Sequence, residues 1–287
     1  MPTPITIEEV ISKTTDLPVI SAIALKVMRE ADNANTTAAR LSHWLGQDPS
    51  LSSRVLRLSN SAYYGLSRKV TTIQDAVVIL GMRCVRNLSM VAATYPWLSK
   101  PLEGYGLEPL MLWQHSHSTA LGAQFVAGKS GRLNPDVAFT GGLLHDIGKL
   151  ALNASLDRKA QALARLADLN GWTFVEAERT VLGFDHGQVG GHLATKWNLP
   201  QEMVDSARFH HEPELAEEPS LVVDAVHIGN YLTMALGFGL GMDGLKYSLS
   251  DGALLRLGLK PADLDVIASD LESEFAAQSK AFEELVA

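Results

Sequence analysis

Helix-starting signals recur along this sequence and constrain its fold more than any other feature. Asp48-Pro49 and Asn134-Pro135 each place a capping side chain before a proline. Proline is tolerated in a first helical turn because its missing N–H would have no partner there. Thr173 followed by Glu176 predicts a capping box. Regular β alternation bounded by turn pairs is nearly absent, so the sequence predicts an all-α, multi-helix fold.

A stretch containing proline and glycine, from Tyr95 to Pro109, interrupts the helical pattern and predicts a boundary. We therefore expect an N-terminal helical lobe in residues 1–100 and a histidine-bearing lobe in residues 101–245. A C-terminal helical tail is expected in residues 246–287, because Pro261 to Val286 reads as amphipathic.

Composition excludes several classes of protein. No apolar run approaches the roughly 20 residues that span a bilayer, and the N-terminus carries acidic residues where a signal peptide is basic. The only cysteine, Cys84, allows neither a disulfide framework nor a cysteine zinc site. The formal net charge of -8 argues against nonspecific nucleic-acid binding. We expect a cytoplasmic protein that contacts neither membrane nor nucleic acid.

Three polar residues interrupt one of the most apolar segments of the chain. His145, Asp146 and Lys149 lie within a stretch, Phe139 to Leu152, that is expected to be one helix. An adjacent histidine and aspartate can both reach a metal ion at a helix edge, and Lys149 could face an anionic ligand. A hydrogen-bonded core histidine beside an Asp-Lys pair is the alternative, and the triplet alone leaves both open.

Further histidines in helical, mainly apolar settings favour the metal interpretation. They are His115, His186, His210, His211 and His227. Imidazoles with one carboxylate suit Fe, Mn, Ni, Co or Zn better than Mg or Ca, and a carboxylate can bridge two ions. The sequence therefore predicts a site for one or two divalent metal ions. His117, His43 and His192 are expected outside the ligand set, with His117 on the surface or beside a ligand.

No organic cofactor is expected. Gly239, Gly241 and Gly244 have the spacing of a dinucleotide-binding loop, but that loop must join a strand to a helix. The preceding residues, Val222 to Leu236, predict a buried helix instead, so we interpret the glycines as a connector.

Ordered motifs around these residues resemble a known family. Four of them look like the motifs of the HD superfamily of metal-dependent phosphohydrolases: Trp113 to Ser116, Leu144 to Lys149, Gly183 to His186 and Phe209 to Pro213. Others resemble the HDOD domain, the HD-related output domain of bacterial signalling proteins: Asp16 to Pro18, Asp48 to Leu51, Leu58 to Gly65 and Ala76 to Gly81. The resemblance implies an HD-like lobe joined to an N-terminal helical lobe.

The resemblance also implies a ligand set. A first metal would be held by His115, His145 and Asp146, and a second, sharing Asp146, would lie near His186, His210 and His211. Either His210 or His211 would bind this metal while the other contacts a ligand or supports the site, and the sequence leaves that choice open. Asn230 stands where the family has its last metal-binding aspartate. An amide offers a carbonyl oxygen without charge, so we expect weaker binding at the first site.

Two functions follow from the resemblance, and the histidines themselves leave a third open. The first is a noncatalytic regulatory output protein that meets signalling proteins in trans, with a metal-binding pocket and a phosphorylated small molecule as ligand. The second is a metal-dependent phosphohydrolase of a nucleotide or other phosphoester, in which Asp146 bridges the metals and Lys149 stabilises phosphate charge. The third is an adaptor whose histidines form a hydrogen-bonded core without metal. Homo-oligomerisation is left open.

Overall fold

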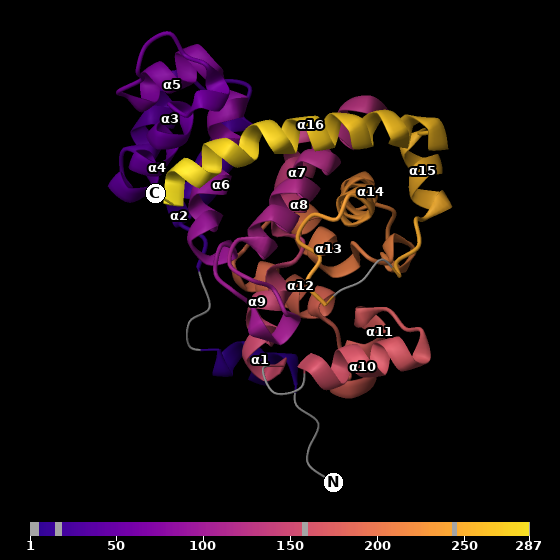
Figure 1. Ribbon diagram of the computed structural model, residues 1–287. Coiled ribbons are helices and arrows are strands. Elements are labelled where there is room, and N and C mark those ends of the chain that lie inside the picture. Colours follow the sequence, from indigo (N-terminus) through magenta and orange to yellow (C-terminus); the bar gives the residue numbers. More distant parts are fainter. Residues whose placement is uncertain (1–5, 15–18, 157–159, 243–245, 287) are drawn as a thin grey trace. The chain divides into compact units, whose positions relative to one another are not determined.

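A computed structural model describes residues 6–14, 19–156, 160–242 and 246–286 (Figure 1). These ranges are helical and contain no strand; one isolated antiparallel bridge joins Leu102 to Leu107. The predicted all-α fold is confirmed. The Asp16-Leu17-Pro18 motif and Gly244 lie outside the described residues.

The chain divides into two compact units, each assembled from two segments. The larger contains residues 1–18 and 98–271, and the smaller contains residues 19–97 and 272–287. This grouping differs from the sequence division at both chain ends. The first residues belong with the histidine-bearing part, and the expected tail is shared between the units at Leu271 and Glu272.

The larger unit holds most of the helices. They are α1 (Ile7–Lys13), α7 (Met111–Ser130), α8 (Pro135–Leu144), α9 (Ile147–Leu156), α10 (Ala160–Asn170), α11 (Phe174–Leu182), α12 (His186–Lys196), α13 (Gln201–Phe209), α14 (Leu221–Ala235), α15 (Asp251–Leu257) and the first part of α16 (Pro261–Val286). Two single 3₁₀ turns, η2 (Glu103–Tyr105) and η3 (Pro213–Leu215), complete it.

The smaller unit is built from shorter helices. They are α2 (Ala22–Ala31), α3 (Ala38–Leu45), α4 (Pro49–Ser59), the 3₁₀ turn η1 (Ala62–Tyr64), α5 (Ile73–Leu80), α6 (Met82–Leu98) to its penultimate residue, and the last part of α16. Apolar residues of α2 to α6 form its core, among them Val27, Leu41, Val55 and Met90.

The helix starts follow the predicted capping signals. The Asp48 side chain accepts the Leu51 N–H at 2.9 Å, and Asn134 accepts the Asp136 N–H at 2.9 Å. Thr173 opens α11 with the expected capping box. Each cap satisfies an N–H that has no partner within its helix, which fixes where the helix begins.

Close helix contacts through glycine hold the centre of the larger unit together. α7 packs on both α8 and α14. A Cβ at Gly122 of α7 would lie 3.0 Å from the Cα of Gly229 in α14, and a Cβ at Gly142 of α8 would lie 2.7 Å from the Cα of Ala120. Such approaches bring the backbones of three helices close enough for their side chains to converge on one small space.

A fourth glycine, Gly148, brings α9 against the start of α12. A Cβ at Gly148 would overlap the carbonyl oxygen of His186 and would lie 2.6 Å from the Gly190 nitrogen. Both obstructing groups are backbone atoms, which cannot move without shifting a helix.

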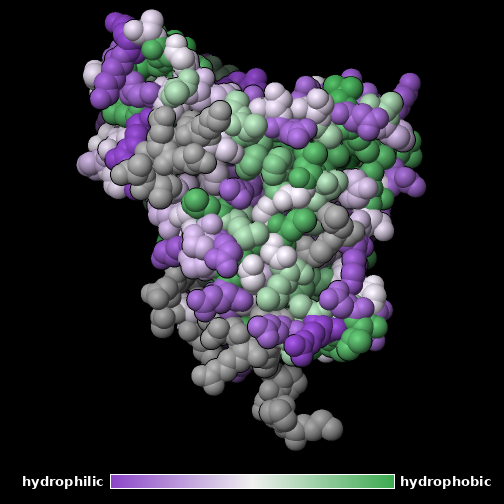
Figure 2. Space-filling model, viewed as in Figure 1, coloured by the Kyte–Doolittle hydropathy of each residue, from purple (hydrophilic) through white to green (hydrophobic). Residues whose placement is uncertain are grey.

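The surface carries apolar side chains in patches among hydrophilic ones on the face seen in Figure 2. Val78, Leu169 and Leu255 are the most exposed large apolar residues of α5, α10 and α15, at 71%, 85% and 79%. Among the described residues, no helix has the length and apolar character needed to cross a membrane.

We expect Gly148→Ala to destabilise the protein by about 3 kcal/mol or more, because overpacking against backbone forces α9 away from α12. Thermal unfolding followed by circular dichroism measures the change. The matched control is Gly128→Ala within α7, where a Cβ meets nothing within 4 Å. That substitution should leave stability unchanged or raise it by up to about 1 kcal/mol. Equal melting temperatures for the two variants would contradict the close contact.

Candidate metal centre

The sequence predicted that the His-Asp pair lies within one helix, but the structure places it between two helices. α8 ends at Leu144 and α9 begins at Ile147, so His145 and Asp146 occupy the turn between them. The single helix expected over Phe139 to Leu152 is therefore wrong. The break adjoins the Gly148 contact with α12, which sets the direction of α9.

Six of the predicted ligands come together: five histidines surround the carboxylate of Asp146. His115 comes from α7, His145 and Asp146 from the α8–α9 turn, His186 from the first residue of α12, and His210 and His211 from the end of α13. Their possible ligand atoms form two groups, each with all atoms within 4.8 Å of one another. The first is His115, His145 and Asp146, and the second is Asp146, His186, His210 and His211.

The two oxygens of Asp146 face different groups. Oδ2 lies 3.4 Å from Nε2 of His115 and 3.4 Å from Nε2 of His145. Oδ1 lies 3.4 Å from Nε2 of His186 and 3.6 Å from Nε2 of His210. Asp146 thus lies between the two groups, in the position of a bridging carboxylate.

The opposite ring nitrogens of four histidines are held by acceptors outside the cluster. Nδ1 of His115, His145 and His210 lies within 3.1 Å of a backbone carbonyl, those of Phe238, Gly142 and Ala207 respectively. Nδ1 of His186 lies 2.8 Å from the Glu178 carboxylate. A carbonyl or carboxylate only accepts, so each Nδ1 carries a proton, and in a singly protonated ring the lone pair of Nε2 then points inward.

Inward lone pairs leave the cluster without enough donors. Nε2 of His145 lies 3.3 Å from Nε2 of His115, and Nε2 of His186 lies 3.1 Å from Nε2 of His211. Among the described residues, Nε2 of His210 and Oδ1 of Asp146 have no hydrogen-bond partner. Buried acceptors without donors are costly, and a cation at their centre removes the cost.

Burial and neighbouring charges prepare these groups to bind a cation. Burial lowers the pKa of His115 to about 4, and it lowers the pKa values of His210 and His211 well below the usual range. Burial would raise the pKa of Asp146, but His145 and Lys149 outweigh it and hold that pKa well below its ordinary value. Neutral imidazoles and an ionised carboxylate are the forms that ligate metal.

Glu178 supports His186 and was not singled out in the sequence. It is fully buried on α11. Its Oε2 accepts the His186 backbone N–H at 2.9 Å as well as Nδ1–H, and its Oε1 accepts the Tyr105 hydroxyl at 2.6 Å. Burial alone would lower the pKa of His186, but the Glu178 charge raises it. A glutamate on the buried face of a capped helix was the signal that could have revealed it.

Lys149 and Asn230, the two remaining predicted site residues, are both buried. The Lys149 ammonium lies 2.8 Å from Oδ2 of Asp146, forming the one full ion pair in the cluster among the described residues. Asn230 lies on α14, and its Oδ1 has no hydrogen-bond partner there. Its role as a ligand stays a prediction.

Other histidines have different surroundings. Nδ1 of His227 donates to the His210 carbonyl at 2.8 Å, and its Nε2 accepts the Ser250 N–H at 3.0 Å, so it fixes the backbone of a cluster residue. His117 is 1% exposed and stacks on Trp113, which rules out the expected surface position.

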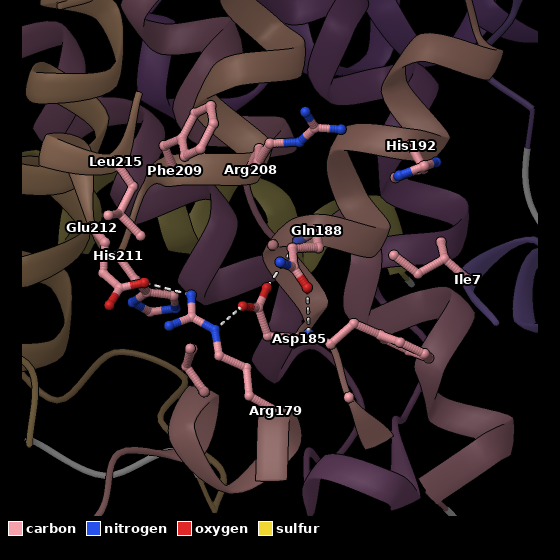
Figure 3. A pocket seen from close by; sticks show the side chains of 14 residues that line it. Ile7, Arg179, Asp185, Gln188, His192, Arg208, Phe209, His211, Glu212 and Leu215 are labelled. Atoms are coloured by element: carbon pink, nitrogen blue, oxygen red, sulfur yellow. Dashed lines mark hydrogen bonds and ion pairs between the residues drawn. The ribbon is translucent and has the colours of Figure 1, made fainter. Parts of the chain in front are cut away.

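The cluster is buried, and His211 is its most exposed member. Asp146, His186 and His210, the other members of the second group, are at most 1% exposed. His211 forms part of the lining of a pocket of about 460 Å³ between α1, α11, α12 and α13 (Figure 3). On another side the Tyr247 ring stacks on His211 at 4.1 Å between centroids. Any small molecule that enters this pocket meets the cluster through one imidazole.

Arg179 forms ion pairs with two carboxylates of the pocket lining, drawn as dashed lines in Figure 3. Its Nε lies 2.6 Å from Asp185, the N-cap of α12, and its terminal nitrogen pairs with Glu212. These carboxylates precede His186 and follow His211, so one guanidinium links the two backbone segments that carry them.

The donor set fits a divalent metal ion. Two groups of imidazoles share one ionised carboxylate, and among the described residues its Oδ1 and Nε2 of His210 have no hydrogen-bond partner. Imidazole-rich sites of this composition suit Fe, Mn, Ni, Co or Zn. The buried His/Asp group could therefore hold metal, and the residues do not select among these ions.

We expect Glu178→Gln to weaken metal binding at the His186 group by roughly 10- to 100-fold, because the carboxylate raises the basicity of the imidazole it orients. Titration with Zn²⁺ against a competing chelator measures the affinity. Glu202 is exposed on α13, so the Glu202→Gln variant should bind Zn²⁺ with the affinity of the unsubstituted protein. Unchanged affinity in Glu178→Gln would exclude the proposed support.

Comparisons with known proteins agree with this architecture. The sequence profile of the HDOD domain matches residues 17–213. An uncharacterised protein of Treponema pallidum (strain Nichols) is 24% identical over 93% of this chain. The match covers 51% of that protein, so this chain spans about half the length of its curated relative.

Solved structures show the same fold. An HDOD domain protein of unknown function from Geobacter sulfurreducens superposes with a TM-score of 0.77 and 26% identity, covering 96% of this chain and 95% of that one. A presumed phosphohydrolase from Shewanella amazonensis SB2B gives a TM-score of 0.69 and 27% identity, covering 97% and 98%.

Proposed function

Because the chain belongs to the HDOD domain family, we propose that it is a regulatory signalling module whose His/Asp cluster binds one or two divalent metal ions. It would act on signalling proteins in trans, in a bacterial cytoplasm where Cys84 stays reduced. A noncatalytic role is favoured because Asp146 and the histidines of the cluster other than His211 are at most 5% exposed.

The arrangement of protons on the histidines carries the metal proposal. His115, His145 and His210 donate Nδ1–H outward to carbonyl groups, so their Nε2 lone pairs surround the Asp146 carboxylate. A hydrogen-bonded core without metal would instead need donors among these nitrogens, which favours metal binding over the adaptor hypothesis.

Bound metal would supply a positive charge that cross-links α7, the α8–α9 turn, α12 and the end of α13. The first group would contribute His115, His145 and Asp146; the second would contribute Asp146, His186, His210 and His211. Lys149 already neutralises part of the Asp146 charge. Metal occupancy would therefore set the stability of the larger unit.

A phosphohydrolase is the second candidate. The pocket reaches the cluster at His211, and the presumed phosphohydrolase of Shewanella amazonensis SB2B is 27% identical. Metal would supply activation of water, with Lys149 placed to balance charge on a phosphate group. Asn230 in place of an aspartate weakens this candidate, because an amide provides no charge at the first site.

Elemental analysis of protein purified without added metal or chelator tests the proposal. We expect one or two transition-metal ions per chain, lost in His145→Ala and in Asp146→Ala, and no turnover in a broad phosphatase screen. The metal-bound protein should also melt at a higher temperature than chelator-treated protein, because metal binds only the folded cluster.

His43→Ala is the matched control, since His43 is exposed and lies outside the cluster. It should keep the metal content of the unsubstituted protein. Absence of metal in that protein would contradict the proposal and leave the adaptor, whereas metal with turnover would establish the phosphohydrolase.

A further inference from the structure

We propose that the pocket beside His211 binds a small organic anion with an apolar body, and that Arg208 holds its oxyanion group. This inference extends beyond the proposed metal binding, because it assigns a ligand to residues outside the cluster and holds whether or not the cluster contains metal.

Arg208 is a cation of the pocket that forms no ion pair with an acidic residue in the described part of the chain. Both carboxylates of the lining, Asp185 and Glu212, bind Arg179 instead. Among the described residues, Arg208 forms no ion pair; its guanidinium carbon lies 5.9 Å from the centre of the Phe209 ring. A half-buried guanidinium that forms no ion pair among the described residues favours an anion from outside the chain.

The fold leaves room for this guanidinium. α13 packs on α12, and a Cβ at Gly191 of α12 would lie 3.0 Å from Nε of Arg208. Figure 3 shows the Arg208 side chain directed toward His192, apart from the Arg179, Asp185 and Glu212 group. Glycine at position 191 therefore lets the Arg208 side chain run along α12 toward the pocket.

Arg208 is also the point where neighbouring hollows meet. It lines the 460 Å³ pocket and two adjoining ones of about 400 and 290 Å³. His192 is common to the first two, and its imidazole lies 3.9 Å from the Glu8 carboxylate. The two adjoining hollows are lined by the acids Glu8, Asp205, Glu217 and Glu218. An anion held at Arg208 is therefore directed into the 460 Å³ pocket, where both carboxylates are paired with Arg179.

The remaining lining selects the body of the ligand. Ile7, Val175, Phe184 and Leu215 give the pocket apolar walls. An organic anion could place its apolar part against these walls and its oxygens on the planar fork of Arg208. Phosphate and carboxylate groups share the geometry that this fork binds through two hydrogen bonds.

Isothermal titration of the full chain with phenyl phosphate and with benzoate tests the proposal and distinguishes the two anions. We expect binding of at least one probe, weakened tenfold or more in Arg208→Gln. Arg165→Gln is the matched control, since Arg165 is exposed on α10 and lines none of these pockets. Its affinity should equal that of the unsubstituted protein.

Two further variants cover the case in which Arg208→Gln fails to fold. Arg208→Lys keeps the charge without the fork and should retain part of the affinity. Gly191→Ala crowds Nε of Arg208 and should weaken binding while keeping the charge. Melting temperatures confirm that each variant is folded, and equal affinity of folded Arg208→Lys, Gly191→Ala and unsubstituted protein would overturn the proposal.

A chelator arm separates this inference from the metal proposal. Binding that persists in EDTA and still depends on Arg208 supports the pocket site even if the cluster holds no metal. Binding that is lost in EDTA assigns the anion to a metal ion and overturns the role of Arg208, as does the absence of binding of both probes to the unsubstituted protein.

Discussion

The ionised carboxylate of Asp146 is the interaction on which the larger unit depends. It is buried, and its oxygens lie 3.4 to 3.6 Å from four imidazole nitrogens carried by α7, the α8–α9 turn, α12 and the end of α13. The Lys149 ammonium, 2.8 Å from Oδ2, gives it a counter-charge. A buried charge persists only where partners compensate for lost hydration, so the helices must stay close enough to provide them.

Packing and chemistry at this centre are linked through glycine. Gly142 and Gly148 flank the His-Asp turn, and each lies against the backbone of another helix. Without those contacts α7 and α12 could not bring His115 and His186 to opposite oxygens of Asp146. The apolar segment that contains the turn therefore serves the geometry of the cluster as well as the core.

The metal cluster and the adjoining pocket favour ligands of opposite charge. The cluster contains several acceptor atoms and favours a cation, whereas Arg208 in the adjoining pocket forms no ion pair among the described residues and favours an anion. His211 belongs to both, since it lies in the second ligand group and in the pocket lining. A signalling module built this way would sense a small molecule at the edge of a metal-stabilised core, with Arg179 linking the segments around it.

The sequence by itself determined the helical class, the helix starts and the residue types of the cluster, because capping and apolar periodicity are local properties. Asp48, Asn134 and Thr173 cap helices as predicted, and six predicted ligands meet. Only the tertiary structure decided which groups surround them. Glu178 behind His186, the break in the helix at Asp146, the buried position of His117 and the unpaired Arg208 all depend on contacts between helices distant in the sequence, which no local pattern encodes.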